Sequence, residues 1–330
     1  MIARTRYFVI ASLLVLTVGV GTGLVAYYVG FPLAATNQAG PEELQYVPRN
    51  ATILAYANVQ DVMVSQLRQR LRQAIPQRGN GQQELQDATG IDIEHDIDRV
   101  VAFAAAESDG PPVSGMVLAR GRFDAVKIEA LMREHGAHVE EYKGRRLIVA
   151  DVPVGPAPAV PERASLSLTF LEPGLVALGG TPIMRRAVDL KDAGGENVTS
   201  NDELMNLVRS LSGDTAWAVG RLDALRSQAQ LPAGLSSQLP PINWFSVSGH
   251  INGGIQGLLR AETRDDESAT NLREVVRGFM ALAKMQSSSR PQLQALVQSL
   301  ELGGAGKTVS LSFMVPAEVF DLVSGAGALK

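Results

Sequence analysis

The feature that most limits what this chain can fold into lies near its start: residues 7–31 contain no charged side chain. As a helix, this run would be about 37 Å long, which exceeds the ~30 Å hydrocarbon core of a bilayer. A run of this length and composition predicts a transmembrane signal-anchor helix at 7–31, through which the chain would contact the membrane.

The charges that flank this run predict its direction. Arg4 and Arg6 precede it, and the first charges after it are Glu42 and Glu43. Positive residues tend to stay on the cytoplasmic side of a membrane. We therefore expect residues 1–6 to be a cytoplasmic N-terminus. The chain would be a single-pass protein of the bacterial inner (cytoplasmic) membrane, with its C-terminal domain outside the cytoplasm.

A secretory signal peptide is the alternative interpretation of the same run. Residues 32–35 read Pro-Leu-Ala-Ala, which would suit a cleavage site. The apolar part of a signal peptide usually has about 7–15 residues, however, so the length of the run favours a retained anchor.

Two glycines in this run form a candidate contact between transmembrane helices. Gly19 and Gly23 are four residues apart, a spacing that allows two helix backbones to approach closely. They suggest a homodimer held through this face of the helix.

Composition describes the part of the chain that follows. Hydrophobic residues make up 45% of the sequence and aromatic residues 5%, so a folded core would be mainly aliphatic. There is no cysteine, which excludes disulfides, thiolate metal sites and cysteine nucleophiles. Acidic side chains outnumber basic ones, 34 to 30, and this balance offers no general attraction for nucleic acid.

Hydrophobic patterning divides the remainder into a flexible stalk at 32–45 and two α+β modules at 46–192 and 193–330. In the first module we expect strands at 52–58, 100–106, 113–120, 139–142, 146–150, 165–171 and 175–178, with helices beginning near Asp61, Asp124 and Thr181. In the second we expect strands at 215–220, 244–251, 255–261, 296–302 and 309–314, with helices beginning near Leu222, Asp265 or Asp266, and Pro316.

The order of these elements predicts the fold class. Each module contains hairpins followed by helices, and the two orders are similar enough to suggest an internal duplication. Hairpins give antiparallel sheets, so we expect two similar modules, each an antiparallel sheet with helices packed on one face.

Two segments carry a resemblance to known proteins. The segment 47–52 (VPRNAT) and the segment 89–100 (TGIDIEHDIDRV) are similar to segments of a loosely defined group of bacterial envelope proteins. That group has an N-terminal anchor or lipoprotein signal followed by duplicated α+β modules of unknown function. The resemblance covers most of residues 45–325 and implies an envelope protein, without an activity.

A glycine-rich string at 303–308 (GGAGKT) is the segment most similar to a phosphate-binding loop. Such a loop needs an earlier glycine, where this chain has Glu301, and a helix after the Gly-Lys-Thr. Here residues 309–314 alternate as a strand does. We therefore interpret the string as a hairpin turn, and no cofactor is predicted.

Alternating acidic residues occur before the second expected strand, at Asp92, Glu94, Asp96 and Asp98. An EF-hand calcium loop would require glycine at its sixth position and a carboxylate at its twelfth, which are Ile97 and Phe103 here. A solvated acidic turn is the preferred interpretation.

The four histidines, His95, His135, His138 and His250, do not form a zinc motif. Gly136 is expected to end the helix between His135 and His138, so these two need not share a face. His135 would lie in the last turn of that helix, where a positive charge is favourable. No metal site is predicted.

No serine lies in a Gly-x-Ser-x-Gly elbow. Ser248 and His250 belong to an expected strand in which Phe245 and Val247 would point inward, whereas Ser246, Ser248 and His250 would point to solvent. Trp217 and Trp244 are expected in the core. No catalytic residue is therefore predicted, although a triad formed by distant residues stays open.

These observations favour a non-enzymatic binding or scaffold protein, attached to the membrane, whose partner would be an envelope protein, a polymer or a small ligand. A cleft between the two modules is where we expect the partner to bind. Two alternatives stay open: an envelope hydrolase whose site is assembled from distant residues, and an accessory subunit of a secretion or transport complex.

Overall fold

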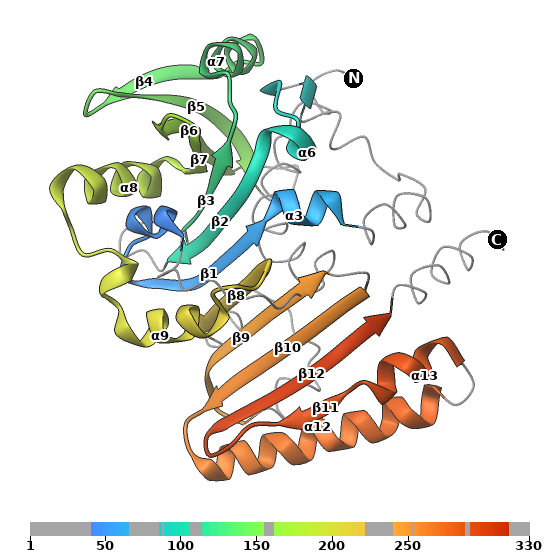
Figure 1. Ribbon diagram of the computed structural model, residues 1–330. Helices are drawn as coiled ribbons and strands as arrows, with labels where there is room; N and C mark the ends of the chain where they lie inside the picture. Colours follow the sequence, from blue (N-terminus) through green and yellow to red (C-terminus); the bar gives the residue numbers. More distant parts are fainter. Residues whose placement is uncertain are drawn as a thin grey trace. The chain divides into compact units, whose positions relative to one another are not determined.

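The structure, a computed structural model, describes residues 41–65, 86–87, 89–105, 114–154, 162–221, 240–251, 254–287 and 291–316 (Figure 1). The predicted cytoplasmic N-terminus at 1–6, the predicted anchor at 7–31 with Gly19 and Gly23, and the final expected helix after Pro316 lie outside these ranges. Within them, no helix combines the length and the apolar character needed to span a membrane.

The described residues form two compact units. Unit 1 contains the described residues at 41–60 and 86–205, and unit 2 contains those at 61–65 and 206–316. Among the described residues, the chain passes from one unit to the other within the helices α3 (Val59–Val64) and α9 (Asp202–Leu211).

Unit 1 consists of seven strands with helices on both sides. The strands are β1 (Ala51–Asn58), β2 (Ile97–Ala105), β3 (Ser114–Gly121), β4 (His138–Tyr142), β5 (Arg145–Val154), β6 (Glu162–Glu172) and β7 (Leu175–Gly180). Its helical elements are the 3₁₀ helices η2 (Glu42–Tyr46) and η3 (Val198–Ser200) and the α-helices α6 (Ile93–Asp96), α7 (Ala125–Glu134) and α8 (Thr181–Ala193).

Unit 2 is built from five strands and two further helices, which Figure 1 shows in yellow to red. The strands are β8 (Ala216–Arg221), β9 (Ile242–Ile251), β10 (Gly254–Thr263), β11 (Glu301–Gly303) and β12 (Thr308–Pro316). The helices are α12 (Asp266–Ser287) and α13 (Pro291–Gln298).

The prediction of two modules, each with its own antiparallel sheet, is wrong. The strands form one sheet of twelve, in the order β11-β12-β10-β9-β8-β1-β2-β3-β7-β6-β5-β4. Periodicity in the sequence predicts where strands lie and which residues share a face. It does not identify which strands pair, because pairing is made by backbone hydrogen bonds that do not depend on side-chain identity. The module boundaries at 192 and 193 stay a prediction.

The prediction that helices cover one face of the sheet is also wrong in unit 1. Ile128 of α7 packs against Ile148, Leu168 and Val176 on one face. On the other face, the first residue of α8, Thr181, is hydrogen-bonded to Ser167 of β6, with 2.7 Å between the hydroxyl oxygens. Both faces are therefore buried.

Burial on both faces explains the apolar runs of unit 1. In β5 the consecutive residues Leu147, Ile148 and Val149 are all buried. Neighbouring residues of a strand point to opposite faces, so a strand covered on both sides cannot show simple alternation. Leu175 and Val176 of β7 are buried in the same way.

The expected stalk does not extend to residue 45. Residues 42–46 form η2, and its Glu43, Leu44 and Tyr46 are buried in unit 1. The folded part of the chain therefore begins at least as early as residue 41.

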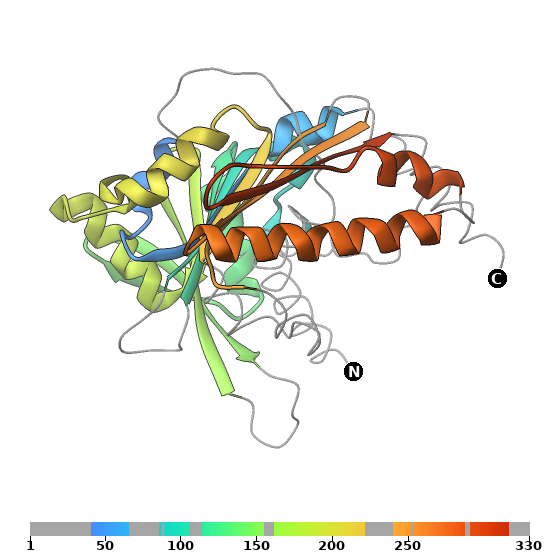
Figure 2. The same ribbon diagram turned by 90° about the horizontal axis from the view of Figure 1, so that it is seen from below.

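In unit 2, α12 lies along one face of the outer strands, as Figure 2 shows from below. Its Ala269 and Leu272 pack against Val309 of β12, with Ala261 of β10 and Leu302 of β11 beside them. Asp265 caps this helix as expected, since its carboxylate accepts a hydrogen bond of 2.8 Å from the backbone N–H of Ser268. Interactions with the side chain and the backbone N–H of Ser268 lower the pKa of Asp265 to about 2.

One predicted strand of unit 2 is partly helical. Residues 296–298 belong to α13, and the strand that pairs with β12 is only Glu301–Gly303. The apolar residues of this segment fit either state, because a short apolar run does not distinguish a helix from a strand.

Candidate functional site

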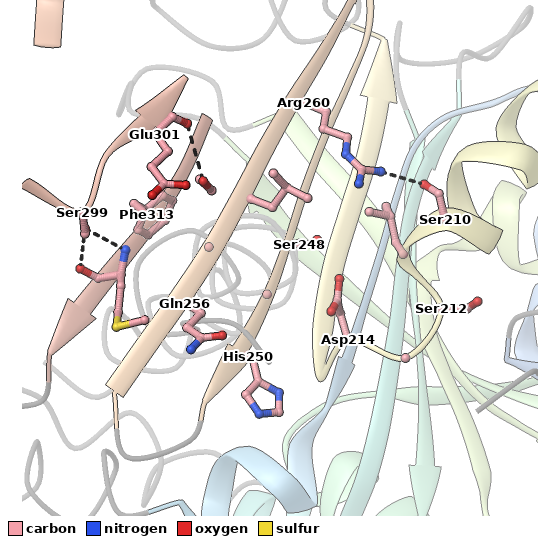
Figure 3. Close-up of a pocket in the computed structure, with 17 residues that line it drawn as sticks. Ser210, Ser212, Asp214, Ser248, His250, Gln256, Arg260, Ser299, Glu301 and Phe313 are labelled. Carbon is pink, nitrogen blue, oxygen red and sulfur yellow. Dashed lines mark hydrogen bonds between the residues drawn. The ribbon is translucent and has the colours of Figure 1, made fainter. Parts of the chain in front are cut away.

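The candidate site is a pocket within unit 2 with a volume of about 630 Å³ (Figure 3). The end of α9 and the turn after it form one wall, and β9, β10, β11 and β12 form the floor. Its polar lining includes five serines and the side chains of Asp214, His250, Gln256, Arg260 and Glu301.

The outer strands present the pocket from the face opposite α12. On β12, Val309 packs against α12, whereas Ser312 and Met314 line the pocket. On β10, Ala261 packs against α12, whereas Arg260 lines the pocket. Successive side chains of a strand point to opposite faces, so one face of these strands forms core and the other forms the pocket floor.

Asp214 of the wall and Ser248 of the floor form the polar centre of the pocket. Burial raises the pKa of Asp214, although the neighbouring Ser248 hydroxyl and the nearby charge of Arg260 oppose the rise. Arg260 also donates a hydrogen bond of 3.3 Å from Nη1 to Oγ of Ser210. A carboxyl group and a guanidinium thus lie in the same pocket.

His250, also on β9, is a further polar group of the pocket floor. Its Nδ1 atom is buried and has no hydrogen-bond partner among the described residues. Burial lowers the pKa of His250 to about 3, so the ring is neutral at physiological pH. A neutral imidazole with a buried, unpaired nitrogen can accept a hydrogen bond or donate one, depending on the tautomer.

These groups suit binding better than nucleophilic catalysis. A serine nucleophile needs a base that takes its proton and a third group that orients the base. Here the titratable group that Ser248 influences is the carboxyl group of Asp214, and no described residue orients the His250 ring through Nδ1. The pocket does offer hydrogen-bonding groups, one cationic side chain, and the apolar side chains of Leu211 and Leu258.

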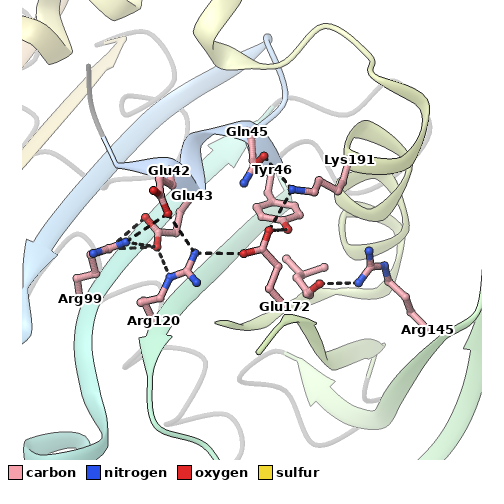
Figure 4. Close-up of polar contacts among 10 residues, drawn as sticks. Glu42, Glu43, Gln45, Tyr46, Arg99, Arg120, Arg145, Glu172 and Lys191 are labelled. Carbon is pink, nitrogen blue, oxygen red and sulfur yellow. Dashed lines mark hydrogen bonds and ion pairs between the residues drawn. The ribbon is translucent and has the colours of Figure 1, made fainter. Parts of the chain in front are cut away.

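A second polar cluster lies in unit 1 and is shown in Figure 4. Glu43 of η2 is only 1% exposed, and its carboxylate lies 3.1 Å from Nη2 of Arg99 and 2.8 Å from Nε of Arg120. Arg120 also lies 3.5 Å from Glu172, which accepts a hydrogen bond of 2.6 Å from the Tyr46 hydroxyl.

This cluster is structural, because its charges are paired with one another. Burial raises the pKa of Tyr46, and the hydrogen bond to Glu172 raises it further. The same hydrogen bond and one from Lys191 lower the pKa of Glu172. Ion pairs and hydrogen bonds therefore connect η2 to β2, β3 and β6, and a hydrogen bond from Lys191 to Gln45 connects it to α8.

The predicted turn with alternating acidic residues is short and partly helical. Asp92 caps α6, since its carboxylate accepts a hydrogen bond of 2.9 Å from the backbone N–H of Glu94. The hydrogen bond from His95 lowers the pKa of Asp92. In the parts of the chain that the structure describes, no group of three or more His, Asp or Glu side chains could hold a metal ion.

The other sequence candidates occupy the local positions expected for them. His135 lies at the end of α7, where its Nδ1 is 2.7 Å from the Leu131 carbonyl oxygen, and His138 lies on β4 beside Glu140. The glycine-rich string at 303–308 forms the turn between β11 and β12 and has Gly304 at φ 93°. Trp217 and Trp244 are buried.

The prediction for β9 has the wrong orientation. Phe245 and Val247 are only partly buried, whereas Trp244, Ser246 and Ser248 are almost fully buried. Sequence reasoning placed Ser248 and His250 toward solvent, and it assigned no role to Asp214 or Arg260. The one signal that could have found the pocket is the alternation of Ser246, Ser248 and His250 on a strand that contains a tryptophan.

Comparisons with known proteins supply little for this chain. No family model matches it, and no curated protein does. A solved structure described as crystal form III of TP0453 aligns with 88% of this chain and 100% of that chain, at 11% sequence identity and a TM-score of 0.46. A similarity at this level supports no argument about function.

Proposed function

We propose that this chain is a membrane-attached binding or scaffold protein of the bacterial cell envelope, and that the pocket of unit 2 is its binding site. The observation that carries the proposal is the pocket itself. Polar side chains from the turn after α9 and from strands β9 and β10, Asp214, His250 and Arg260, meet there beside apolar ones. A concave site with a few converging polar groups is typical of ligand binding.

Attachment to the membrane is proposed through residues 7–31, with the N-terminus in the cytoplasm and the remainder outside. The uncharged run and the arginines before it support this part of the proposal. Residues 32–40 would then be the connection to the folded part, and nine residues can span at most about 30 Å. Unit 1 would thus lie close to the bilayer surface.

The binding site can be tested by photo-crosslinking in living cells. A photoreactive amino acid at position 314 would place the probe in the pocket, because the Met314 side chain lines it and is 45% exposed. We expect a discrete adduct that disappears when Asp214→Ala and Arg260→Ala are introduced together. The control is the same probe at Val126, an 82% exposed residue of α7 in unit 1. Equal adducts at both positions, or one that survives both substitutions, would contradict the proposal.

The hydrolase alternative makes a different prediction, which one reagent can test. A fluorophosphonate probe reacts with serines that a base activates. We expect no labelling of the wild-type chain, because no described residue orients the His250 imidazole through Nδ1 to act as a base. Labelling that is lost in Ser248→Ala would replace the binding proposal with an enzymatic one.

The alternative of an accessory subunit is tested by purification in mild detergent. A membrane protein that co-purifies in stoichiometric amount with both the wild type and the Asp214→Ala, Arg260→Ala variant would favour the subunit over the pocket-binding protein.

A further inference from the structure

The second half of α12 leaves an apolar stripe exposed. Phe279 is 46% exposed, Leu282 is 54% exposed and Met285 is 72% exposed. Residues three apart on a helix lie on the same side, so these three form one stripe. Three large apolar side chains in a row are more than the scattered exposure that is ordinary on a protein surface.

The side of α12 that carries this stripe is polar in the first half of the helix and apolar in the second half. With 3.6 residues per turn, Asn271 and Glu274 lie on the side that carries Leu282 and Met285 further along. The N-terminal half of α12 packs against the sheet through Ala269 and Leu272. The helix is therefore an ordinary surface helix in its first half and presents apolar side chains to the outside in its second half.

The charges of this half have one sign. From Arg277 to Ser287 the sequence contains Arg277 and Lys284 and no acidic residue. On a helix of 3.6 residues per turn, both basic side chains lie along the same edge of the apolar stripe. Arg277 has an ion pair with Glu274, one turn earlier. An exposed apolar stripe with lysine or arginine at its edge is the pattern of helices that lie in the interface of an anionic bilayer.

We propose that the C-terminal half of α12 lies on the surface of an anionic lipid bilayer, with Phe279, Leu282 and Met285 in contact with lipid. The proposal rests on the membrane attachment proposed above, which would keep the chain next to a bilayer. A second contact of this kind adds to the first without needing high affinity of its own, because tethering raises the local concentration of the helix at the surface. It would also limit the orientations of unit 2 relative to the membrane.

The absence of cysteine from the sequence allows a direct test. A single cysteine introduced by Met285→Cys in the full chain can carry an environment-sensitive fluorophore. The matched control is Asn271→Cys, which puts the same fluorophore on the same side of α12 but at its polar end. Both labelled chains are reconstituted into vesicles of phosphatidylcholine mixed with phosphatidylglycerol. Some of the lipids carry a nitroxide quencher on the acyl chain.

We expect the nitroxide to reduce fluorescence at position 285 at least about twofold more than at position 271. The difference in quenching between positions 285 and 271 should be smaller in vesicles of phosphatidylcholine alone and in the Lys284→Glu variant. Both changes remove electrostatic attraction between the helix and anionic lipid. The paired substitution Phe279→Asp and Leu282→Asp should abolish it. Both positions are exposed, so these changes should leave the fold intact, which circular dichroism would check.

Two results would overturn the inference. The fluorophore at position 285 could stay accessible to a water-soluble quencher in the vesicles, which would mean that the stripe faces water. Alternatively, it could be protected from both quenchers in detergent and in vesicles alike, which would mean that a second copy or another segment of the chain covers the stripe.

Flotation of the vesicles on a density gradient separates this inference from the proposed membrane attachment. If the chain floats with the vesicles but position 285 is not quenched, only the contact of α12 fails. If neither the wild type nor the Phe279→Asp, Leu282→Asp variant floats, both the attachment through residues 7–31 and the contact of α12 fail.

Discussion

At the scale of single residues, His250 makes the pocket of unit 2 sensitive to acid. Its pKa falls from an ordinary 6.5 to about 3 because burial disfavours the charged ring. Between these two values the unfolded chain binds a proton that the folded chain does not bind. The part of the unfolding free energy that depends on a neutral His250 is therefore fully present above about pH 6.5 and is lost as the pH falls toward 3.

We expect the wild type to lose about 2 kcal/mol of unfolding free energy through this residue between about pH 7 and pH 5. His250→Gln should remove this part of the pH dependence, as chemical unfolding at the two pH values would show. Gln256→Ala alters the same pocket without removing a titratable group, so it should keep the wild-type dependence. If the wild type and His250→Gln lose equal amounts of unfolding free energy between the two pH values, the histidine is solvated when the chain is folded.

At the scale of elements, glycines in two neighbouring elements have opposite roles. In α12, a Cβ atom added at Gly278 would have no other atom within 4 Å. In β10, a Cβ atom added at Gly257 would lie 2.1 Å from Cζ of Phe313, whose ring occupies that space. The first glycine weakens its helix, whereas the second makes room for a packed ring.

Gly278→Ala should therefore stabilise the chain by up to about 1 kcal/mol, the difference in helix propensity between the two residues. Gly257→Ala should destabilise it by about 1–3 kcal/mol, because the Phe313 ring must move. Thermal unfolding of the two variants beside the wild type measures both effects. A loss of stability in Gly278→Ala would show that something contacts this part of α12.

At the scale of the whole molecule, ion pairs to Glu43 fix η2 to the sheet of unit 1. Glu43 is buried between Arg99 and Arg120, whereas the adjacent Glu42 is 78% exposed and lies 4.0 Å from each of the same guanidinium groups. Breaking a buried pair leaves a charge without a partner, whereas an exposed pair contributes little.

Glu43→Gln should cost about 3 kcal/mol of unfolding free energy, toward the low end for a buried pair because both arginines are partly exposed. Glu42→Gln should change it by less than about 0.5 kcal/mol. Denaturant unfolding of the two variants compares neighbours that have the same side chain and differ in burial. Similar costs for both would mean that the burial of Glu43 is not maintained in solution.

Local structure could be predicted from the sequence wherever short-range chemistry decides it. Hairpin turns appear at the predicted places, such as Lys143-Gly144, where both residues adopt positive φ. Asp124 caps α7 through the backbone N–H of Lys127, as its position before an apolar repeat indicated. The uncharged run at 7–31 is likewise a property of the sequence alone, and it remains the basis of the proposed membrane attachment.

Tertiary structure alone decided which groups meet. Asp214, Ser248 and Arg260 are separated in sequence and belong to no motif, so their convergence depends on strand order and on the position of α9. The same holds for Glu43, whose two arginines come from β2 and β3. Periodicity also gave β9 the wrong orientation, because Ser246 and Ser248 are buried whereas Phe245 and Val247 are only partly buried. The sequence determines hydrogen-bonding patterns over a few residues, whereas strand pairing and burial depend on contacts between distant segments.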